Sequence, residues 1–322
     1  MLRAIFMAAG LVLALGIQAS ESVAPDPSGL RLASVSALVT KLDAEAPLFD
    51  KRADWVMPIA SITKVMTAMV VLDSGADLEE RLTVEKRHFA AAANAYSRIR
   101  PESMAKRGDL LHISLMSSEN YAAYLLARHH PQGYDAFIQA MNAKARELGM
   151  ENTHFVDSSG LSDANVSTAS DLAKMLSAAY RYPQIRQAST ASKHDVWFTQ
   201  PGYSLYYANT NPLVRSSRWD VLLSKTGYLT DAGRCLAMVV NVEGEPTAMV
   251  FLDSFGKRTP LGDAGRTRRW LTTGDGGSVA GAAARYEAEK AGQLAQRQRP
   301  ASENPIGGPA VGTSLQASGA SQ

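Results

Sequence analysis

Strand-like segments lie at both ends of the chain and enclose a helical middle, and this order constrains the fold more than any other feature. Residues 34–40 alternate at period two like a strand, and residues 47–51 supply a hairpin partner. Apolar stretches near the other end read as strands, at 221–224, 235–242 and 247–252. The fold class we expect is α/β of the α+β type. One antiparallel sheet is closed by sequence-distant strands, is flanked by helices and carries an inserted all-helical subdomain.

The middle of the chain shows apolar periodicity and clear helix-end signals. Thr168 and Asp171 form a capping box, and Gly149 stands where a helix is expected to stop. The helices predicted from the sequence cover residues 62–72, 110–116, 121–129, 134–148, a stretch that starts at 168, and 264–271.

The two ends of the 322-residue chain differ in composition from its middle. Residues 1–19 combine a short positive start with an uncharged apolar run and a cleavage-site sequence, Ile17-Gln18-Ala19, before Ser20, which predicts a cleaved secretory signal peptide. An uncleaved anchor is the alternative, but the run is shorter than the ~20 residues that span a bilayer. Residues 274–322 are rich in Gly, Ala, Gln, Ser and Pro and predict a disordered tail, in which 282–296 has the pattern of a weakly packed charged helix. The folded domain is expected at 27–272.

Composition argues against several functions. The chain has 33 Lys and Arg against 31 Asp and Glu, and this near balance is not typical of a nucleic-acid-binding protein. The single cysteine, Cys235, allows no internal disulfide and no Cys-based zinc cluster, and we expect it to be packed within its strand. The six histidines lack a metal-binding spacing. We therefore expect no metal site and no cofactor.

The first candidate for a reactive residue is a serine that precedes a lysine by three positions. Of three such patterns, only Ser61 with Lys64 stands at the start of an apolar helix; the others are Ser103 with Lys106 and Ser254 with Lys257. Residues i and i+3 share a helix face, so the Lys64 amine can reach the Ser61 hydroxyl and accept its proton if burial lowers the amine's pKa. Taken alone, the pair also fits an N-capping serine and a lysine that extends to solvent.

Two further motifs favour the reactive pair over the N-capping serine and the solvent-exposed lysine. Ser118-Glu119-Asn120 lies between two predicted helices, and Lys225-Thr226-Gly227 ends an apolar strand. A second Ser-x-Asn, at 302–304, lies in the low-complexity tail and is discarded. A loop serine and a surface lysine would explain each motif separately. Their order after Ser-x-x-Lys is the signature of penicillin-binding proteins and serine β-lactamases.

On these residues the sequence resembles low-molecular-mass penicillin-binding proteins of the D-alanyl-D-alanine carboxypeptidase family of serine peptidases. Within the family it is most similar to the endopeptidase branch, the penicillin-binding protein 7 type. The resemblance covers roughly residues 34–271, and the segments that carry it are 33–39, 58–73, 115–120, 149–155 with 160–161, and 225–228. It implies a β-lactamase/transpeptidase-like fold.

The resemblance also implies catalytic roles. Ser61 is the nucleophile that forms an acyl-enzyme, Lys64 is its general base, and Ser118 relays a proton to the leaving amine. The backbone N–H groups of Ser61 and Tyr228 form the oxyanion hole. We expect the nearby Lys225 amine to lower the pKa of Lys64.

Substrate-binding roles follow in the same way. Asn120 holds the amide on the acyl side, and Lys225 and Thr226 bind the carboxylate of the substrate or of a β-lactam. Gly227 lets the strand approach the substrate closely. Glu119 stands where the signature has Asp, at a position whose side chain need not touch substrate.

The function implied is that of a periplasmic serine DD-peptidase. Its partners are peptidoglycan stem peptides, with β-lactam antibiotics as covalent inhibitors. The chain shows neither the second β domain nor the amphipathic membrane anchor of many carboxypeptidases, and this favours an endopeptidase that cuts D-Ala-diaminopimelate cross-links and has no stable membrane anchor. The alternatives are a D-Ala-D-Ala carboxypeptidase, a serine β-lactamase and a non-catalytic wall-binding protein. The β-lactamase is disfavoured because no Glu-x-x-Leu-Asn string lies between Asn120 and Lys225.

Two lesser candidates remain open in the sequence. Tyr207 and Asn209 match the Tyr-x-Asn of some β-lactamases and esterases, although they lie just before Lys225 in a strand or loop. The basic pair Lys257-Arg258 is either part of a carboxylate-binding site or a solvated turn.

Overall fold

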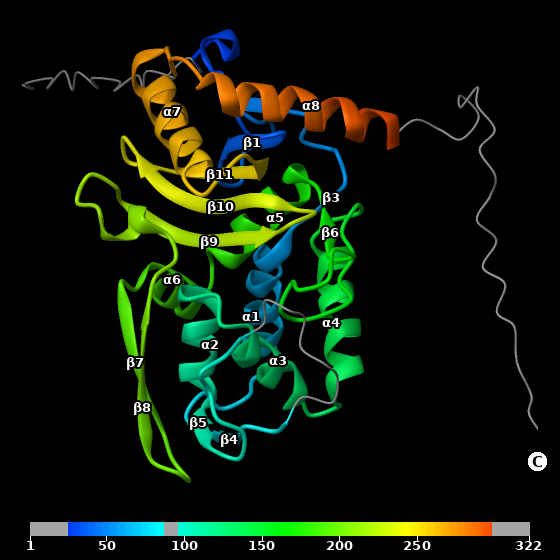
Figure 1. Cartoon of the computed structure of the whole chain (residues 1–322), viewed down its shortest axis with the longest axis vertical. Helices are drawn as coiled ribbons and strands as arrows, with labels where there is room; N and C mark the ends of the chain where they lie inside the picture. The colour runs from blue at the N-terminus through cyan, green and yellow to red at the C-terminus, as the bar shows by residue number, and fades with distance from the viewer. Residues whose placement is uncertain (1–24, 87–95, 298–322) are drawn as a thin grey trace, which may run out of the picture.

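A five-stranded antiparallel sheet joins the two ends of the chain (Figure 1). The computed structural model describes residues 25–86 and 96–297, so the expected signal peptide lies outside the described residues. In spatial order the strands are β2 (Phe49–Lys51), β1 (Ser36–Lys41), β11 (Glu245–Ser254), β10 (Gly233–Val242) and β9 (Val221–Leu229). Ser36 lies opposite Leu252 in the pairing of β1 with β11, which confirms the predicted closure by sequence-distant strands.

Both faces of this sheet are apolar because its strands alternate two sets of buried side chains. Leu236 and Met238 face a core that includes Trp270 of α7 (Thr259–Thr273), whereas Ala237 and Val239 face the larger core of the helical region. Helix α5 (Ala169–Ala179) packs on that second side against β1, β10 and β11, and α1 (Thr63–Asp73) packs against α5. The sheet is thus the middle layer of three (Figure 1).

The helical region lies between β2 and β9 in the chain. The structure confirms each of the predicted helices in this region, and their end signals act as expected: the Thr168 hydroxyl accepts the N–H of Asp171 at 3.0 Å, and Gly149 has φ +68° just after α4. Its other elements are α2 (Arg107–Met116), α3 (Asn120–Arg128), α4 (Tyr134–Glu147), α6 (Pro183–Thr190), the strand pairs β3 (Met57–Pro58) with β6 (Val166–Ser167), β4 (Arg81–Thr83) with β5 (Met104–Lys106) and β7 (Lys193–Phe198) with β8 (Tyr203–Ala208), and the 3-10 turns η2 (Ala60–Ile62) and η3 (Pro212–Arg215).

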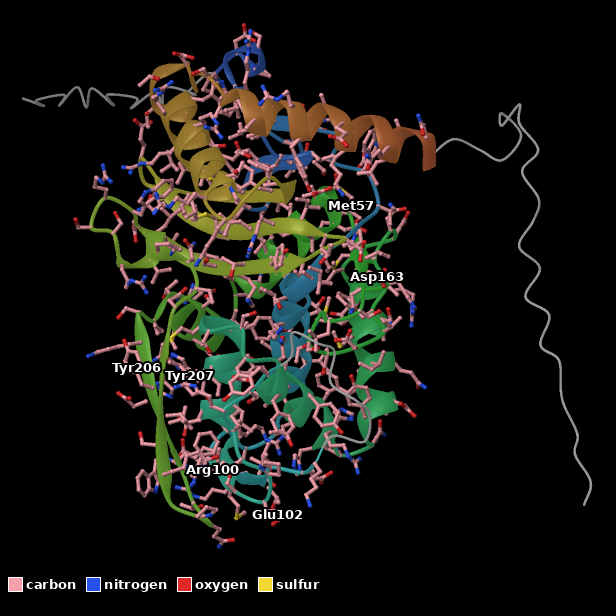
Figure 2. All side chains as sticks on the ribbon, in the orientation of Figure 1. Met57, Arg100, Glu102, Asp163, Tyr206 and Tyr207 are labelled. Carbon is pink, nitrogen blue, oxygen red and sulfur yellow. The ribbon has the colours of Figure 1, made fainter. Side chains whose placement is uncertain are left out.

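One strand prediction is wrong, and one pair of strands was not predicted. Lys225-Thr226-Gly227 does not end its strand, since β9 continues to Leu229 and Gly227 pairs with Cys235 of β10. The hairpin of β7 and β8 was not predicted as a pair of strands, because its short segments place polar and charged residues on the solvent face. Figure 2 shows Tyr206 and Tyr207 side by side on β8; Tyr206 is exposed and Tyr207 is buried.

The predicted charged helix in the tail is present as α8 (Gly281–Arg297). It is attached to the domain: the Tyr286 hydroxyl donates to Asp253 at 2.5 Å, and Glu287 pairs with Lys51 at 3.2 Å and with Arg52. Residues 281–297 are therefore helical rather than disordered, while 298–322 lie outside the described residues. Within residues 25–86 and 96–297, no helix has both the length and the apolar character needed to cross a membrane.

Candidate active site

Ser61 and Lys64 meet where the chain enters α1. Ser61 lies in the 3-10 turn η2, directly before the helix rather than in its first α-helical turn. The Lys64 Nζ atom is 2.8 Å from the Ser61 Oγ atom, as the i, i+3 spacing predicted. The pair is therefore in direct hydrogen-bond contact.

The other two Ser-x-x-Lys patterns, both within the described residues, form no such pair. The Ser103 hydroxyl donates to the carbonyl of Arg100 at 2.6 Å, while Lys106 pairs with Glu79 at 2.7 Å. The Ser254 hydroxyl bonds that of Ser34 at 2.7 Å, and no hydrogen bond joins it to Lys257. The geometry thus separates the first pattern from the two chance matches.

Lys64 is fully buried, and its amine has three partners. Besides Ser61 Oγ, they are Asn120 Oδ1 at 2.7 Å and the carbonyl oxygen of Ser159. A neutral amine fits this set, because two N–H groups donate to the two carbonyl-type oxygens and the lone pair is left to accept the Ser61 proton.

Burial lowers the pKa of Lys64 to about 7, although the charges of Asp157 and Glu119 oppose this. Desolvation is thus the main cause, rather than the neighbouring Lys225 amine that we expected. For Lys225, burial and then the charge of Lys64 hold the pKa well below its ordinary value. The two amines do not both carry a proton easily, and Lys64 is poised to accept one near neutral pH.

The sequence analysis missed Asp157, which organises the loop behind Lys64. Its carboxylate accepts the backbone N–H groups of Ser159 and Gly160 at 2.7 Å and of Ser162 at 2.8 Å. Burial raises the pKa of Asp157, but these hydrogen bonds outweigh it and lower that pKa below the ordinary value. The loop thereby holds the Ser159 carbonyl against Lys64. A signal was present, because Asp followed by Ser-Ser-Gly is typical of a side chain that caps its own turn.

Two glycines permit the close packing around Ser61. A Cβ atom on Gly160 would lie 2.0 Å from the carbonyl oxygen of Ala60, and Gly160 has φ +77°. A Cβ atom on Gly227 would lie 3.0 Å from the carbonyl oxygen of Ile59 and 3.2 Å from the Ser61 nitrogen. Gly227 thus brings β9 against the backbone of the reactive turn, in addition to the approach to substrate that we expected.

Ser118 lies in the tight turn between α2 and α3, and Asn120 is the first residue of α3. Ser118 has φ +62°, an uncommon conformation for a residue with a side chain, and it lies where α2 has ended. Glu119 accepts the N–H of Tyr121 at 3.1 Å and so caps α3. Asn120 uses its oxygen for Lys64 and keeps its amide N–H groups as donors.

The residues of β9 divide between the cleft and the interior. Thr226 lines the cleft, and its hydroxyl is 2.7 Å from that of Thr210. Tyr228 also lines it and is 49% exposed. Lys225 is buried, and its amine donates to the carbonyl of Thr226 at 2.8 Å.

These elements surround one cleft of about 990 Å³. It brings together six of the eight predicted site residues, namely Ser61, Ser118, Asn120, Thr226, Gly227 and Tyr228. Lys64 and Lys225 lie behind its wall and contact lining residues.

The alternative Tyr-x-Asn motif does not build a second site. Tyr207 is 5% exposed, packs in the core and has the guanidinium of Arg98 over its ring at 5.1 Å. Burial raises its pKa further above the ordinary value, which disfavours proton transfer by its hydroxyl. The Asn209 amide binds the backbone carbonyls of Ser189 and Ala191 and thus has a structural role.

Acyl transfer requires a hydroxyl beside a proton acceptor, with substrate-binding donors on the facing wall. A serine bonded to a buried lysine, opposite an edge strand with Lys-Thr-Gly, supplies these on this fold. The combination defines the class of penicillin-interacting serine enzymes.

Comparisons with known proteins identify the family within this class. The family model of D-alanyl-D-alanine carboxypeptidases, a peptidase family, matches residues 20–256. The chain is 46% identical over 277 residues to the D-alanyl-D-alanine endopeptidase of Escherichia coli K12, covering 86% of this chain and 89% of that one. It is 45% identical over 285 residues to the endopeptidase of Pseudomonas aeruginosa, with coverages of 87% and 92%.

Solved structures agree on the fold. The DD-transpeptidase of Streptomyces K15 superposes with a TM-score of 0.67 at 27% identity, covering 74% of this chain and 95% of that one. Penicillin-binding protein D2 of Listeria monocytogenes, in its ampicillin-bound form, gives 0.63 at 27% identity, with coverages of 73% and 96%. The chain belongs to the D-alanyl-D-alanine carboxypeptidase family, and the expected β-lactamase/transpeptidase-like fold is confirmed.

Proposed function

We propose that this protein is a serine DD-peptidase that cleaves D-Ala peptide bonds of peptidoglycan through an acyl-Ser61 intermediate. The observation that carries the proposal is the 2.8 Å contact between Ser61 and the buried amine of Lys64. Lys64 takes the Ser61 proton as the Oγ atom attacks the D-Ala carbonyl carbon. The backbone N–H groups of Ser61 and Tyr228 stabilise the oxyanion.

Collapse of the tetrahedral intermediate breaks the peptide bond and forms the ester. Ser118 relays the proton that Lys64 holds to the leaving amine. Water then attacks the ester, so that the acyl stem leaves as a free carboxylic acid and Ser61 regains its proton. Each step moves one proton, and the reaction consumes one water.

Substrate contacts follow from the cleft walls. Asn120 donates its amide N–H to the peptide on the acyl side, since its oxygen is held by Lys64. Thr226 binds the carboxylate next to the scissile bond, and Gly227 lets substrate lie close to the strand. Lys225 is buried, so it contributes to carboxylate binding in two indirect ways. Its amine holds the carbonyl of Thr226 on β9 in place, and its positive charge attracts the carboxylate when the amine is protonated.

The preferred bond is the cross-link between D-Ala and diaminopimelate. The relatives at 45% and 46% identity are named endopeptidases, whereas those named carboxypeptidases are 27% to 32% identical. A D-Ala-D-Ala carboxypeptidase is the second candidate. The site of action is the periplasm, reached by means of the signal peptide at 1–19, and β-lactams acylate Ser61.

The first test is labelling with fluorescent penicillin. Native protein should retain a covalent label, and Ser61→Ala should retain none, because its hydroxyl is the atom acylated. Ser103→Ala is the matched control, since it removes the serine of a second Ser-x-x-Lys and should label like the native protein. Equal labelling of native protein and Ser61→Ala would refute the assignment.

The second test concerns the bond cleaved. Purified cross-linked muropeptide dimers and pentapeptide monomers are supplied at equal concentration, and products are identified by mass. We expect the higher specificity constant for dimers. Faster release of D-alanine from monomers would make the protein a carboxypeptidase and leave the site unchanged.

A further inference from the structure

Four cationic side chains line the same cleft as Ser61, and one of them lies over the ring of Tyr228. These are Arg215 of η3, Arg234 of β10, and Lys257 and Arg258 from the loop before α7; we call this group the cationic arm. None of the described residues that line the cleft is Asp or Glu. The whole chain has a net charge of only +2, so this concentration of positive charge is local.

Two side chains of the cationic arm are held in place, and none of the four forms an ion pair with a carboxylate among the described residues. The Arg215 Nη1 atom donates to the carbonyl of Asn209 at 3.2 Å. The guanidinium of Arg234 lies 3.6 Å from the centre of the Tyr228 ring. The remaining N–H groups of the four side chains are available to a ligand.

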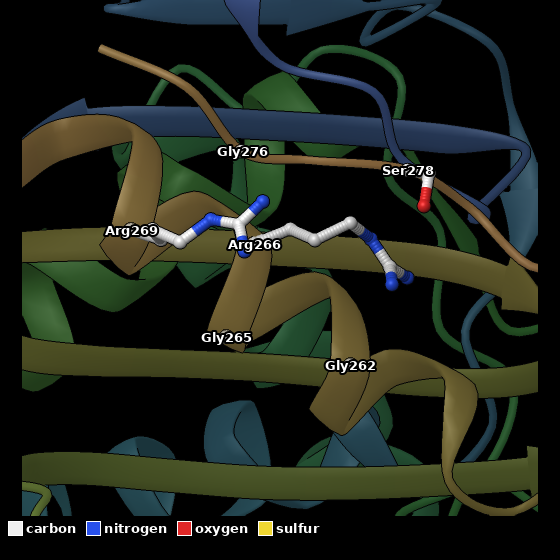
Figure 3. Close-up of a pocket in the computed structure, with 6 residues that line it drawn as sticks. All are labelled: Gly262, Gly265, Arg266, Arg269, Gly276 and Ser278. Carbon is white, nitrogen blue, oxygen red and sulfur yellow. The ribbon is translucent and has the colours of Figure 1, made fainter. Parts of the chain in front are cut away.

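A neighbouring hollow on α7 shows the contrast. Figure 3 shows Arg266 and Arg269, two of the residues that line this hollow of about 330 Å³. Arg266 already pairs with the Asp263 carboxylate at 2.6 Å, and Arg269 pairs with the Asp275 carboxylate at 3.9 Å. Paired arginines of this kind stabilise the fold, whereas the cationic arm retains binding capacity.

We infer that the cationic arm binds the carboxylates of the second peptide stem in a cross-linked substrate. The inference rests on the proposed function. Monomeric and cross-linked substrates both place one carboxylate beside the scissile bond, at Thr226. Only the cross-linked substrate continues from there as a stem with further carboxylates. The cationic arm lines the same cleft, with Arg234 directly beside Tyr228.

Binding of the second stem by the cationic arm would favour cross-linked substrates over pentapeptide monomers. An arginine presents a planar fork of donors to a carboxylate, and pre-positioned forks lose little freedom on binding. Contacts to the leaving stem raise the specificity constant to the extent that they persist in the transition state. A free D-alanine leaving group cannot use them. The cationic arm therefore favours cross-links over pentapeptide ends.

The test compares two double variants that each lose one arginine and one lysine charge. Arg215→Gln with Lys257→Gln alters the cationic arm. Arg181→Gln with Lys41→Gln is the control, because those residues line a different hollow beside β1 and α5. The readout is the ratio of the specificity constants for dimers and for pentapeptide monomers. We expect this ratio to fall at least tenfold in the first variant and to stay within twofold of native in the control.

Salt and substrate charge provide independent readouts. Raising NaCl from about 20 mM to about 300 mM should slow native cleavage of dimers more than that of monomers, and this difference should vanish in the cationic-arm variant. Dimers with amidated stem carboxylates should be cleaved by native protein as poorly as unmodified dimers by the variant. An unchanged ratio in the variant, or equal losses on both substrates, would overturn the inference. Native protein that leaves dimers intact would instead refute the endopeptidase proposal.

Discussion

At the scale of single residues, the environment of Lys64 determines what Ser61 can do. An ordinary lysine is protonated at neutral pH and cannot accept a proton. Here burial outweighs the attraction of Asp157 and Glu119 and brings the pKa to about 7. The same Asp157 holds the loop that presents the Ser159 carbonyl to the amine. Asp157 thus both positions Lys64 and opposes its deprotonation.

Asp157→Asn should move the acid limb of penicillin acylation to lower pH. Acylation requires neutral Lys64, so the rate rises as pH passes upward through its pKa of about 7. Loss of the Asp157 charge removes a cause that raises this pKa, and the rise should then begin at lower pH. The measurement is the acylation rate between about pH 5 and 9.

The control for this prediction is Asp163→Asn, an exposed carboxylate in the same loop. This variant should have the same acid limb in its pH profile of acylation as the native protein. A purely structural role of Asp157 would lower the rate at every pH without moving the limb, and that outcome would contradict the electrostatic argument.

At the scale of elements, the sequence did not predict that α8 is attached to the domain. Its composition is that of a solvated helix, yet Tyr286 and Glu287 bond to groups on the domain. Burial raises the pKa of Asp253 even though the Tyr286 hydrogen bond opposes this, so the carboxyl is partly desolvated under the helix. The helix is therefore attached both by specific polar contacts and by an apolar face, since Ala283 is buried and Tyr286, Ala291 and Leu294 pack against the core.

Truncation after Ala280 should lower the melting temperature by roughly 4–8 °C, because loss of these hydrogen bonds costs about 2 kcal/mol in a domain of this size. Calorimetry or circular dichroism measures the shift. A chain that ends at Arg297 is the control, since it keeps α8. If the two truncated chains melt at the same temperature, α8 does not stabilise the domain.

At the scale of the whole molecule, a single core joins the helical region to the sheet. It includes Val65 of α1, Phe137 of α4, Leu172 of α5, and Val239 and Val250 of the sheet. The inserted helices therefore do not form a separate domain. Neither part keeps its apolar face covered when the other unfolds.

This predicts one cooperative unfolding transition in urea. Far-ultraviolet circular dichroism, which reports helices, and near-ultraviolet dichroism, which reports packed aromatic side chains, should give the same midpoint. Helical signal that persists after the near-ultraviolet signal is lost would show that the helical region is stable without the sheet.

The whole molecule also shows how far sequence reasoning reaches. Period-two alternation predicted the sheet, and helix-end signals predicted most of the helices. The order of the three motifs singled out the pair of Ser61 and Lys64. The hairpin of β7 and β8 was missed because its two short strands pair only with each other and mix charged and aromatic residues. The contact of Ser159 with Lys64, and the position of Lys257 in the same cleft as Ser61, bring together segments that are far apart in sequence. No local pattern encodes such contacts.

The pairing of the first strand with the last has a consequence for the time at which the enzyme can form. The hydroxyls of Ser34 and Ser254 bond each other although they are 220 residues apart. At about 5–20 residues per second, a ribosome needs roughly 10–40 s to deliver the second after the first. For that interval β1 lacks the strand that will cover its edge. A chain that leaves the ribosome before β11 has been synthesised therefore cannot complete its central sheet.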